Sequence, residues 1–199
     1  LAGPENLYSS LEEAVRACEC YQAYHAGEYA AYSNWGTALA AYIVERTSGT
    51  DYVTYVNENI FAPLGMEHTS IHPLQADNAW VAEKRSGLKC YSRYSDPPYN
   101  EDYGECRSYV QLFPAGAAIG TIGDFAAFGQ ALVSEECPLF ENSDTRDIML
   151  QATSFYGSSD IAMNCHGLWT NENLVQTLGH AGNSNGCTSN LVFDPVSGL

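Results

Sequence analysis

The strongest constraint on the fold is a β pattern near the end of the chain. Two segments, residues 174–182 and 188–194, alternate apolar and polar residues and contain β-branched side chains, which is typical of strands. The glycine-rich sequence GHAGNSNG at residues 179–186 includes the end of the first segment and continues toward the second, which an Asp-Pro pair ends. We therefore expect an antiparallel hairpin at this point of the chain.

The same glycine-rich sequence contains G-x-S-x-G, the motif of a hydrolase nucleophile elbow, with Ser184 in the nucleophile position. An elbow needs a helix directly after the turn, because the helix N-terminus helps to stabilise the oxyanion. The residues after Gly186 predict a strand, so we interpret the motif as a hairpin loop. The alternative, an α/β-hydrolase that uses Ser184, requires a helix directly after Gly186.

A second motif, S-x-x-K, occurs at Ser86 and Lys89. On a helix this spacing places both side chains on one face, where the amine can activate the hydroxyl. Gly87 lies inside the motif and no amphipathic pattern surrounds it, so the sequence favours a solvated basic loop.

Size and charge exclude several classes of protein. The 199 residues are 45% hydrophobic and 16% charged, as in a globular protein, and we expect residues 1–199 to form a single domain. The net charge of −16 repels phosphate backbones and anionic lipids, so we expect no nucleic-acid partner. No apolar run is long enough to predict a membrane span.

Seven cysteines are many for a cytosolic protein and favour an extracellular or cell-envelope location. The odd number means that one is free or has its partner outside the chain. Cys90 and Cys106 enclose a tyrosine-rich, loop-like segment and are the pair that we expect to form a disulfide. The alternative is seven inert thiols.

Capping residues and periodicity predict five helices. The predicted N-caps are Ser10, Asn34, Thr50, Thr121 and Ser143. The second helix, residues 34–48, places Leu39, Ile43 and Thr47 on one face, and Gly49 ends it. Residues 68–113 have poor periodicity, and we expect a long loop there with one or two short strands.

Five motifs occur in a fixed order along the chain. They are EYAAYSN at 28–34 before a helix that ends in TSG, NIFAPLGM at 59–66, PAGA at 114–117, DFAAFGQAL at 124–132, and HAG at 180–182. Together they resemble the serine β-lactamase-like, penicillin-binding-protein-like hydrolase family, which includes class C β-lactamases, D-aminopeptidases and related esterases. The resemblance extends from about residue 27 to the end of the chain.

The resemblance implies an α/β (α+β) fold of the β-lactamase/transpeptidase type, in which helices flank an antiparallel sheet. In this family the catalytic S-x-x-K motif precedes Y-x-N. No serine before Tyr32 has a lysine three residues later. The resemblance therefore implies that the nucleophile and its lysine lie before Leu1, that the domain is incomplete at both ends, and that this chain alone is inactive.

The resemblance also assigns roles to residues of this chain. Tyr32 would shuttle a proton between the serine and the leaving group. Asn34 would bind the acyl side chain of the substrate or the lysine, in addition to capping the helix. On the strand, His180 and Ala181 would line the cleft, Gly182 would leave room for the substrate, and the N–H of Asn183 would stabilise the oxyanion.

One departure from the family pattern concerns the substrate. This chain has His180 and Ala181 where penicillin-recognising members have K-T-G. The permanent charge and the hydroxyl that bind a carboxylate are therefore missing, which favours esters or other acyl compounds over β-lactams or D-Ala-D-Ala peptides.

The expected reaction is acyl transfer through an acyl-enzyme, on an ester, amide or β-lactam/peptidoglycan-type substrate. The partner would be a small-molecule or peptide acyl substrate, and no cofactor is expected. We expect no metal site either, since His68 and His72 are followed by Pro73 in a loop context. The alternative function is a non-catalytic module that binds cell-wall peptide or a protein partner. Oligomeric state is not predicted.

Overall fold

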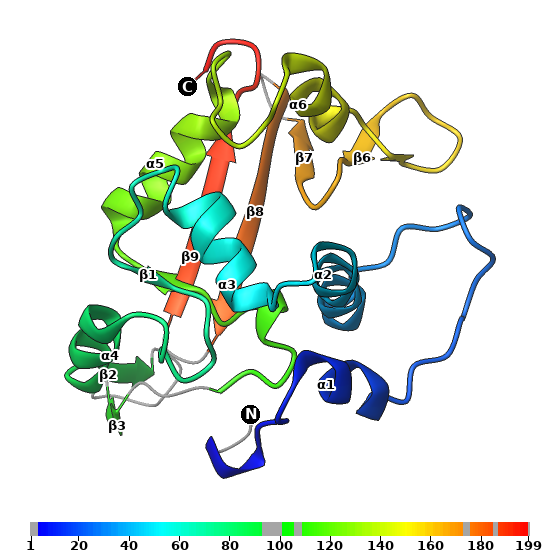
Figure 1. Cartoon of the computed structure of the whole chain (residues 1–199). Helices are drawn as coiled ribbons and strands as arrows, with labels where there is room; N and C mark the ends of the chain where they lie inside the picture. The colour runs from blue at the N-terminus through cyan, green and yellow to red at the C-terminus, as the bar shows by residue number, and fades with distance from the viewer. Residues whose placement is uncertain (1–3, 93–100, 106–108, 173–175, 185–186, 199) are drawn as a thin grey trace.

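The computed structural model describes residues 4–92, 101–105, 109–172, 176–184 and 187–198. Helices dominate the first part of the chain, and an antiparallel sheet forms the last part (Figure 1). The helical elements are η1 (Pro4–Asn6), α1 (Leu11–Ala17), α2 (Asn34–Ser48), α3 (Tyr52–Val56), the π-helical turn η2 (Asn57–Phe61), α4 (Ala79–Ser86), η3 (Phe113–Ala115), α5 (Ile122–Val133) and α6 (Ser143–Leu150). Across the described segments, no helix is both long and apolar enough to cross a membrane.

The main sheet is a meander of five strands in the order β5-β6-β7-β8-β9. The strands are β5 (Ser154–Phe155), β6 (Ala162–Asn164), β7 (Trp169–Glu172), β8 (Gln176–Ser184) and β9 (Cys187–Phe193). The predicted hairpin is confirmed as β8 and β9, which pair from Leu178 opposite Phe193 to Ser184 opposite Cys187. The short strands β5, β6 and β7 were not predicted from the sequence.

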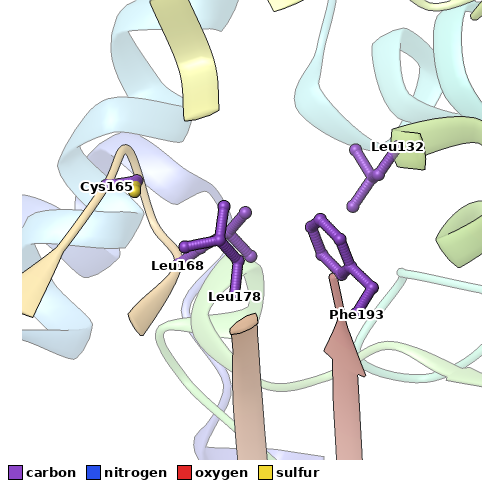
Figure 2. Packing of buried hydrophobic residues seen from close by; sticks show 5 residues of the cluster. All are labelled: Leu132, Cys165, Leu168, Leu178 and Phe193. Atoms are coloured by element: carbon purple, nitrogen blue, oxygen red, sulfur yellow. The ribbon is translucent and has the colours of Figure 1, made fainter. Parts of the chain in front are cut away.

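The core between this sheet and α5 shows how the helix covers one face of the strands. Leu132 of α5, which is 1% exposed, belongs to a buried cluster with Leu178, Phe193, Leu168 and Cys165 (Figure 2). Leu178 and Phe193 are directly opposite each other in the hairpin, so their side chains share a face of the sheet. The predicted arrangement of helices against an antiparallel sheet is confirmed.

Local capping chemistry explains several helix ends. The hydroxyl of Ser10 accepts a hydrogen bond from Glu13 N at 3.1 Å, as predicted. The predicted cap Thr121 likewise accepts from Asp124 N at 3.2 Å. Gly49 ends α2 with a φ of 74°, a conformation that favours glycine.

Three of the five predicted caps are wrong by one residue, and two of them are those of α3 and α6. Asp51, rather than Thr50, caps α3 by accepting from Thr54 N at 3.0 Å. Asn142, rather than Ser143, caps α6. In each case two residues able to cap are adjacent, so the sequence correctly predicted that a helix begins there but placed its N-cap one residue too early or too late.

The expectation of a loop over residues 68–113 is partly wrong. Asn78 caps helix α4 by accepting from Val81 N at 3.1 Å. One or two short strands were expected there, and the described part of this stretch contains three. They are β1 (Thr69–Ser70), which pairs with β4 (Ile119–Gly120) further along the chain, and β2 (Lys89–Ser92), which pairs with β3 (Glu101–Glu105). The predicted Cys90–Cys106 disulfide lies outside the described residues.

Asp124 fastens the start of α5 to the β1 strand. Its Oδ2 accepts hydrogen bonds from His68 N at 2.8 Å and from the Thr69 hydroxyl at 2.7 Å, and its Oδ1 accepts from the Thr121 hydroxyl at 3.1 Å. Burial raises the pKa of this carboxyl, but the hydrogen bonds outweigh burial and hold the pKa below its usual value. The carboxylate is therefore a structural tie between segments that are about 55 residues apart in the sequence.

Candidate functional site

The predicted Y-x-N motif lies at the entrance of α2. Ser33 is extended, with φ −147° and ψ 109°, and its hydroxyl accepts a hydrogen bond from Gly36 N at 3.0 Å. Ser33 is therefore the N-cap, and the prediction that Asn34 caps the helix is wrong. Asn34 is instead the first residue of α2, next to the N-cap.

Two contacts fix this end of α2 in the fold. The indole Nε1 of Trp35 donates to the carbonyl of Val15 in α1 at 3.0 Å. Ala38, which is 0% exposed, and Ala41 pack against α1 through their small side chains. Of the predicted face of Leu39, Ile43 and Thr47, Leu39 packs against this cluster, whereas Ile43 is 54% exposed.

The His-Ala-Gly motif lies in the second half of β8. His180 and Gly182 have the same parity as Leu178, so they project to the face of the sheet that α5 covers. Ala181 and Asn183 project to the opposite face. Gly182 lies opposite Ser189, and a Cβ atom there would come within 2.6 Å of the Ser189 hydroxyl.

The fold brings Tyr32 and His180 together although 147 residues separate them in the sequence. Their ring centroids are 5.9 Å apart and the ring planes are inclined at 40°. Tyr32 is 61% exposed and His180 is half-buried, so both rings can be approached by a molecule at the surface. The helix-entrance motif and the strand motif thus form one candidate site.

The strand β8 extends past its neighbour β7 at this site. β7 pairs with residues 176–179 of β8 and ends there, whereas β9 pairs with β8 up to Ser184. In an antiparallel ladder alternate residues direct their N–H groups to opposite edges. Ser184 lies opposite Cys187 across a two-residue connection, where the facing residues exchange both backbone hydrogen bonds. Every second residue before Ser184 therefore bonds to β9 as well. Ala181 and Asn183 have the other parity, so their N–H groups point to the edge that β7 does not cover.

The two serine motifs that stand outside this site do not have the geometry of nucleophiles. Ser184 ends β8 and is followed by strand β9, which contradicts the α/β-hydrolase alternative. Ser86 is the last residue of α4 and its hydroxyl donates to the Glu83 carbonyl at 2.7 Å, whereas Lys89 begins β2. Ser86 and Lys89 therefore do not share a helical face.

The histidine pair that the sequence raised as a metal candidate has other contacts. The His68 ring packs edge-on against Trp80 with centroids 4.3 Å apart. His72 Nδ1 accepts from Leu74 N at 3.0 Å. Within the part of the chain that the structure describes, no three His, Cys, Asp or Glu side chains are grouped closely enough to hold a metal ion.

A second aspartate, Asp77, ties the start of η2 to β1, and the sequence gave no signal for it. Asp77 accepts hydrogen bonds from Asn57 Nδ2 and Ile71 N, both at 3.1 Å, and a short one from the Ser70 hydroxyl. Burial raises the pKa of Asp77, but the hydrogen bonds from these donors lower it by more, so the pKa stays below its usual value. The partners lie 6 to 20 positions away from Asp77 in the sequence, and only folding brings them to its carboxylate.

Comparison with known proteins agrees with this arrangement. The family model described as Beta-lactamase matches residues 6–199. The human mitochondrial serine β-lactamase-like protein LACTB is 33% identical over 117 residues, which are 57% of this chain and 19% of that protein.

Solved structures show the same fold. The octameric penicillin-binding protein homologue from Pyrococcus abyssi matches with a TM-score of 0.73 and 19% identity, over 94% of this chain and 41% of that chain. The D-amino acid amidase from Ochrobactrum anthropi SV3 complexed with L-phenylalanine amide matches with a TM-score of 0.64 and 26% identity, over 86% and 48% of the two chains. This chain spans less than half the length of each of these relatives. It belongs to the β-lactamase family, whose members are serine hydrolases.

Proposed function

We propose that this chain forms the tyrosine and strand side of the active site of a serine hydrolase that acts through an acyl-enzyme. The nucleophilic serine and its lysine come from an S-x-x-K segment outside the 199 residues, so the chain alone does not form the acyl-enzyme. The observation that carries the proposal is the approach of Tyr32 to His180, with ring centroids 5.9 Å apart.

Tyr32 is the proton shuttle in this proposal. Its phenol accepts the proton of the attacking serine and returns it to the leaving group, which requires an accessible hydroxyl beside the reacting atoms. The 61% exposure of Tyr32 supports this role. Asn34, two residues later in the chain, offers a donor and an acceptor that bind the acyl side chain of the substrate or the lysine.

The strand supplies the opposite wall. His180 lines the cleft with its side chain, Ala181 lines it only with its backbone because its side chain projects to the other face of the sheet, and Gly182 keeps that part of the wall free of a side chain. The N–H of Asn183 points to the open edge of β8 and donates to the developing oxyanion, with the second donor coming from the nucleophile segment. The open edge supports this role because a neighbouring strand there would consume the same N–H group.

Charge favours a neutral or cationic substrate. A net charge of −16 disfavours the approach of an anion. His180 and Ala181 also lack the permanent charge and the hydroxyl that would bind a substrate carboxylate. An amide or ester of an amino acid with a free amino group fits both observations, and the D-amino acid amidase, 26% identical to this chain, was solved with such an amide bound.

The test is active-site labelling of the full-length protein that contains this chain. A fluorophosphonate probe and a fluorescent penicillin are applied to the wild type, to Tyr32→Phe and to Ser184→Ala. We expect fluorophosphonate labelling of the wild type, a loss of labelling rate of about 10²- to 10⁴-fold in Tyr32→Phe, and unchanged labelling in Ser184→Ala.

Two results would contradict the proposal. If neither probe labels well-folded full-length protein, the acyl-enzyme is absent and the non-catalytic binding module is the better description. If Ser184→Ala abolishes labelling while Tyr32→Phe does not, the nucleophile lies in the hairpin and the assigned roles are wrong.

A further inference from the structure

Two cysteines at the end of α1 have their sulfur atoms close together. Cys18 is the C-cap of α1, and Cys20 follows after a single intervening residue, Glu19. Their Sγ atoms are 2.8 Å apart, and one thiol donates a hydrogen bond to the other. A disulfide bond is about 2.05 Å long, so the sulfurs are within about 0.8 Å of bonding distance.

The backbone holds the two side chains in this position. Cys20 N donates to the Cys18 carbonyl at 3.0 Å, which closes a three-residue turn. The turn brings both side chains to one side of the chain without help from a distant segment. The hydrogen bond with Cys18 also raises the pKa of the Cys20 thiol, which agrees with a close thiol pair.

Exposure distinguishes this pair from the two buried thiols among the described residues. Cys20 is exposed and Cys18 is half-buried, and they lie where the chain leaves α1 for the long segment that leads to α2 (Figure 1). Cys137 and Cys165 are buried. Cys187, at the start of β9, is exposed and serves as a reference for a reactive thiol on a different element.

We propose that Cys18 and Cys20 form a thiol–disulfide exchange site for small disulfides. The Cys20 thiolate attacks one sulfur of the small disulfide, forms a mixed disulfide and releases one thiolate. The Cys18 thiolate then attacks the Cys20 sulfur, closes the Cys18–Cys20 bond and releases the second thiolate. The protein loses two protons and two electrons, and the small disulfide is reduced to two thiols.

Charge selects among small disulfides at this site. Glu19 lies between the two cysteines, and the whole chain carries a charge of −16. A cationic disulfide such as cystamine therefore approaches more readily than an anionic one such as oxidised glutathione. For this reason the experiment uses cystamine as the probe.

The test measures the state of each cysteine after the reduced full-length protein is exposed to cystamine, by alkylation of remaining thiols and peptide mass spectrometry. We expect the wild-type peptide that contains Cys18 and Cys20 to lose two hydrogens. In Cys18→Ser, the mixed disulfide at Cys20 should persist at a level at least about tenfold above that of the wild type, because the neighbouring thiol that would resolve it is gone. Cys187 should retain its mixed disulfide in both proteins.

A mixed disulfide at Cys20 that persists equally in the wild type and in Cys18→Ser would overturn the proposal. So would a disulfide that joins either cysteine to another part of the chain in place of Cys18–Cys20. The buried Cys137 gives the background rate of reaction with cystamine. If Cys18 and Cys20 react no faster than Cys137, the inference is also refuted.

Discussion

The carboxylate of Asp124 gives the sharpest test of how this fold is held together. It accepts hydrogen bonds from His68 N, the Thr69 hydroxyl and the Thr121 hydroxyl, at 2.8, 2.7 and 3.1 Å. The substitution Asp124→Asn keeps the shape of the side chain and removes its charge. An asparagine can still accept from His68 and Thr69 through its carbonyl oxygen, but both bonds then join neutral groups.

The size of the effect follows from this difference. A hydrogen bond to a charged group contributes about 1.5–3 kcal/mol and a neutral one about 1 kcal/mol. Weakening two such bonds should therefore lower the free energy of unfolding by about 2 kcal/mol. Asp124→Ala should cost more, about 3–5 kcal/mol, because it leaves the buried Thr69 hydroxyl without this acceptor.

The dependence on pH has a definite sign. Hydrogen bonds make the pKa of Asp124 lower in the folded state than in the unfolded chain, although burial opposes them. The stabilisation is thus complete above the unfolded pKa of about 4 and is lost as pH falls through the lower, folded pKa. The difference between wild type and Asp124→Asn should be constant near neutral pH and should shrink in acid.

Urea unfolding followed by tryptophan fluorescence, at neutral and at acidic pH, measures both quantities. Asp194→Asn is the matched control, since the Asp194 carboxylate accepts hydrogen bonds from Val196 N and the Ser197 hydroxyl, two and three residues later in the chain, and these donors hold its pKa below the usual value. We expect this control to change stability far less than Asp124→Asn. Equal stability of Asp124→Asn and wild type at neutral pH would refute the reasoning, as would a difference that stays undiminished in acid.

Two further substitutions test the strands and the helix entrance. Gly179→Ala places a Cβ atom 2.1 Å from the Leu191 carbonyl oxygen, so the β8–β9 backbones must separate, and urea unfolding should show a loss of about 3 kcal/mol. Gly182→Ala should cost clearly less, because it meets a hydroxyl that can rotate away, and equal losses would disprove the backbone explanation. Ser33→Ala should cost about 1 kcal/mol through loss of the cap at α2, whereas Asn34→Ala should cost little, and the reverse order in thermal unfolding would restore Asn34 as the cap.

Features that depend on neighbouring residues could be predicted from the sequence. The caps Ser10 and Thr121, the glycine end of α2 and the β8–β9 hairpin all arise from interactions within a few residues. Where two capping residues are adjacent, as at Ser33 and Asn34, local chemistry does not choose between them. The structure decides through the backbone angles at the start of the helix.

Features that depend on packing were missed. α2 packs on α1 through Ala38 and Ala41, which carry little hydrophobic signal, while the more apolar Ile43 is exposed. Helix α4 has a weak pattern, since its buried residues are Val81 and Arg85. The strands β5, β6 and β7 are only two to four residues long, which is too short for periodicity to identify.

The sequence by itself determined the members of the candidate site. The motif at Tyr32 and Asn34 and the motif from His180 to Asn183 were identified by their order along the chain and their resemblance to a family. The sequence also excluded Ser184 as an elbow nucleophile, because the residues after Gly186 predict a strand, and β9 is that strand.

Only the tertiary structure decided that these motifs meet. The approach of Tyr32 to His180 results from long-range packing, with α5 seated on the β8–β9 hairpin and the entrance of α2 tied to α1 by Trp35. The open edge of β8 likewise exists because β7 ends before Ala181, and strand length is set by pairing between segments. Local sequence specifies which groups are present and how each element begins, whereas distances between elements follow from how their buried faces pack.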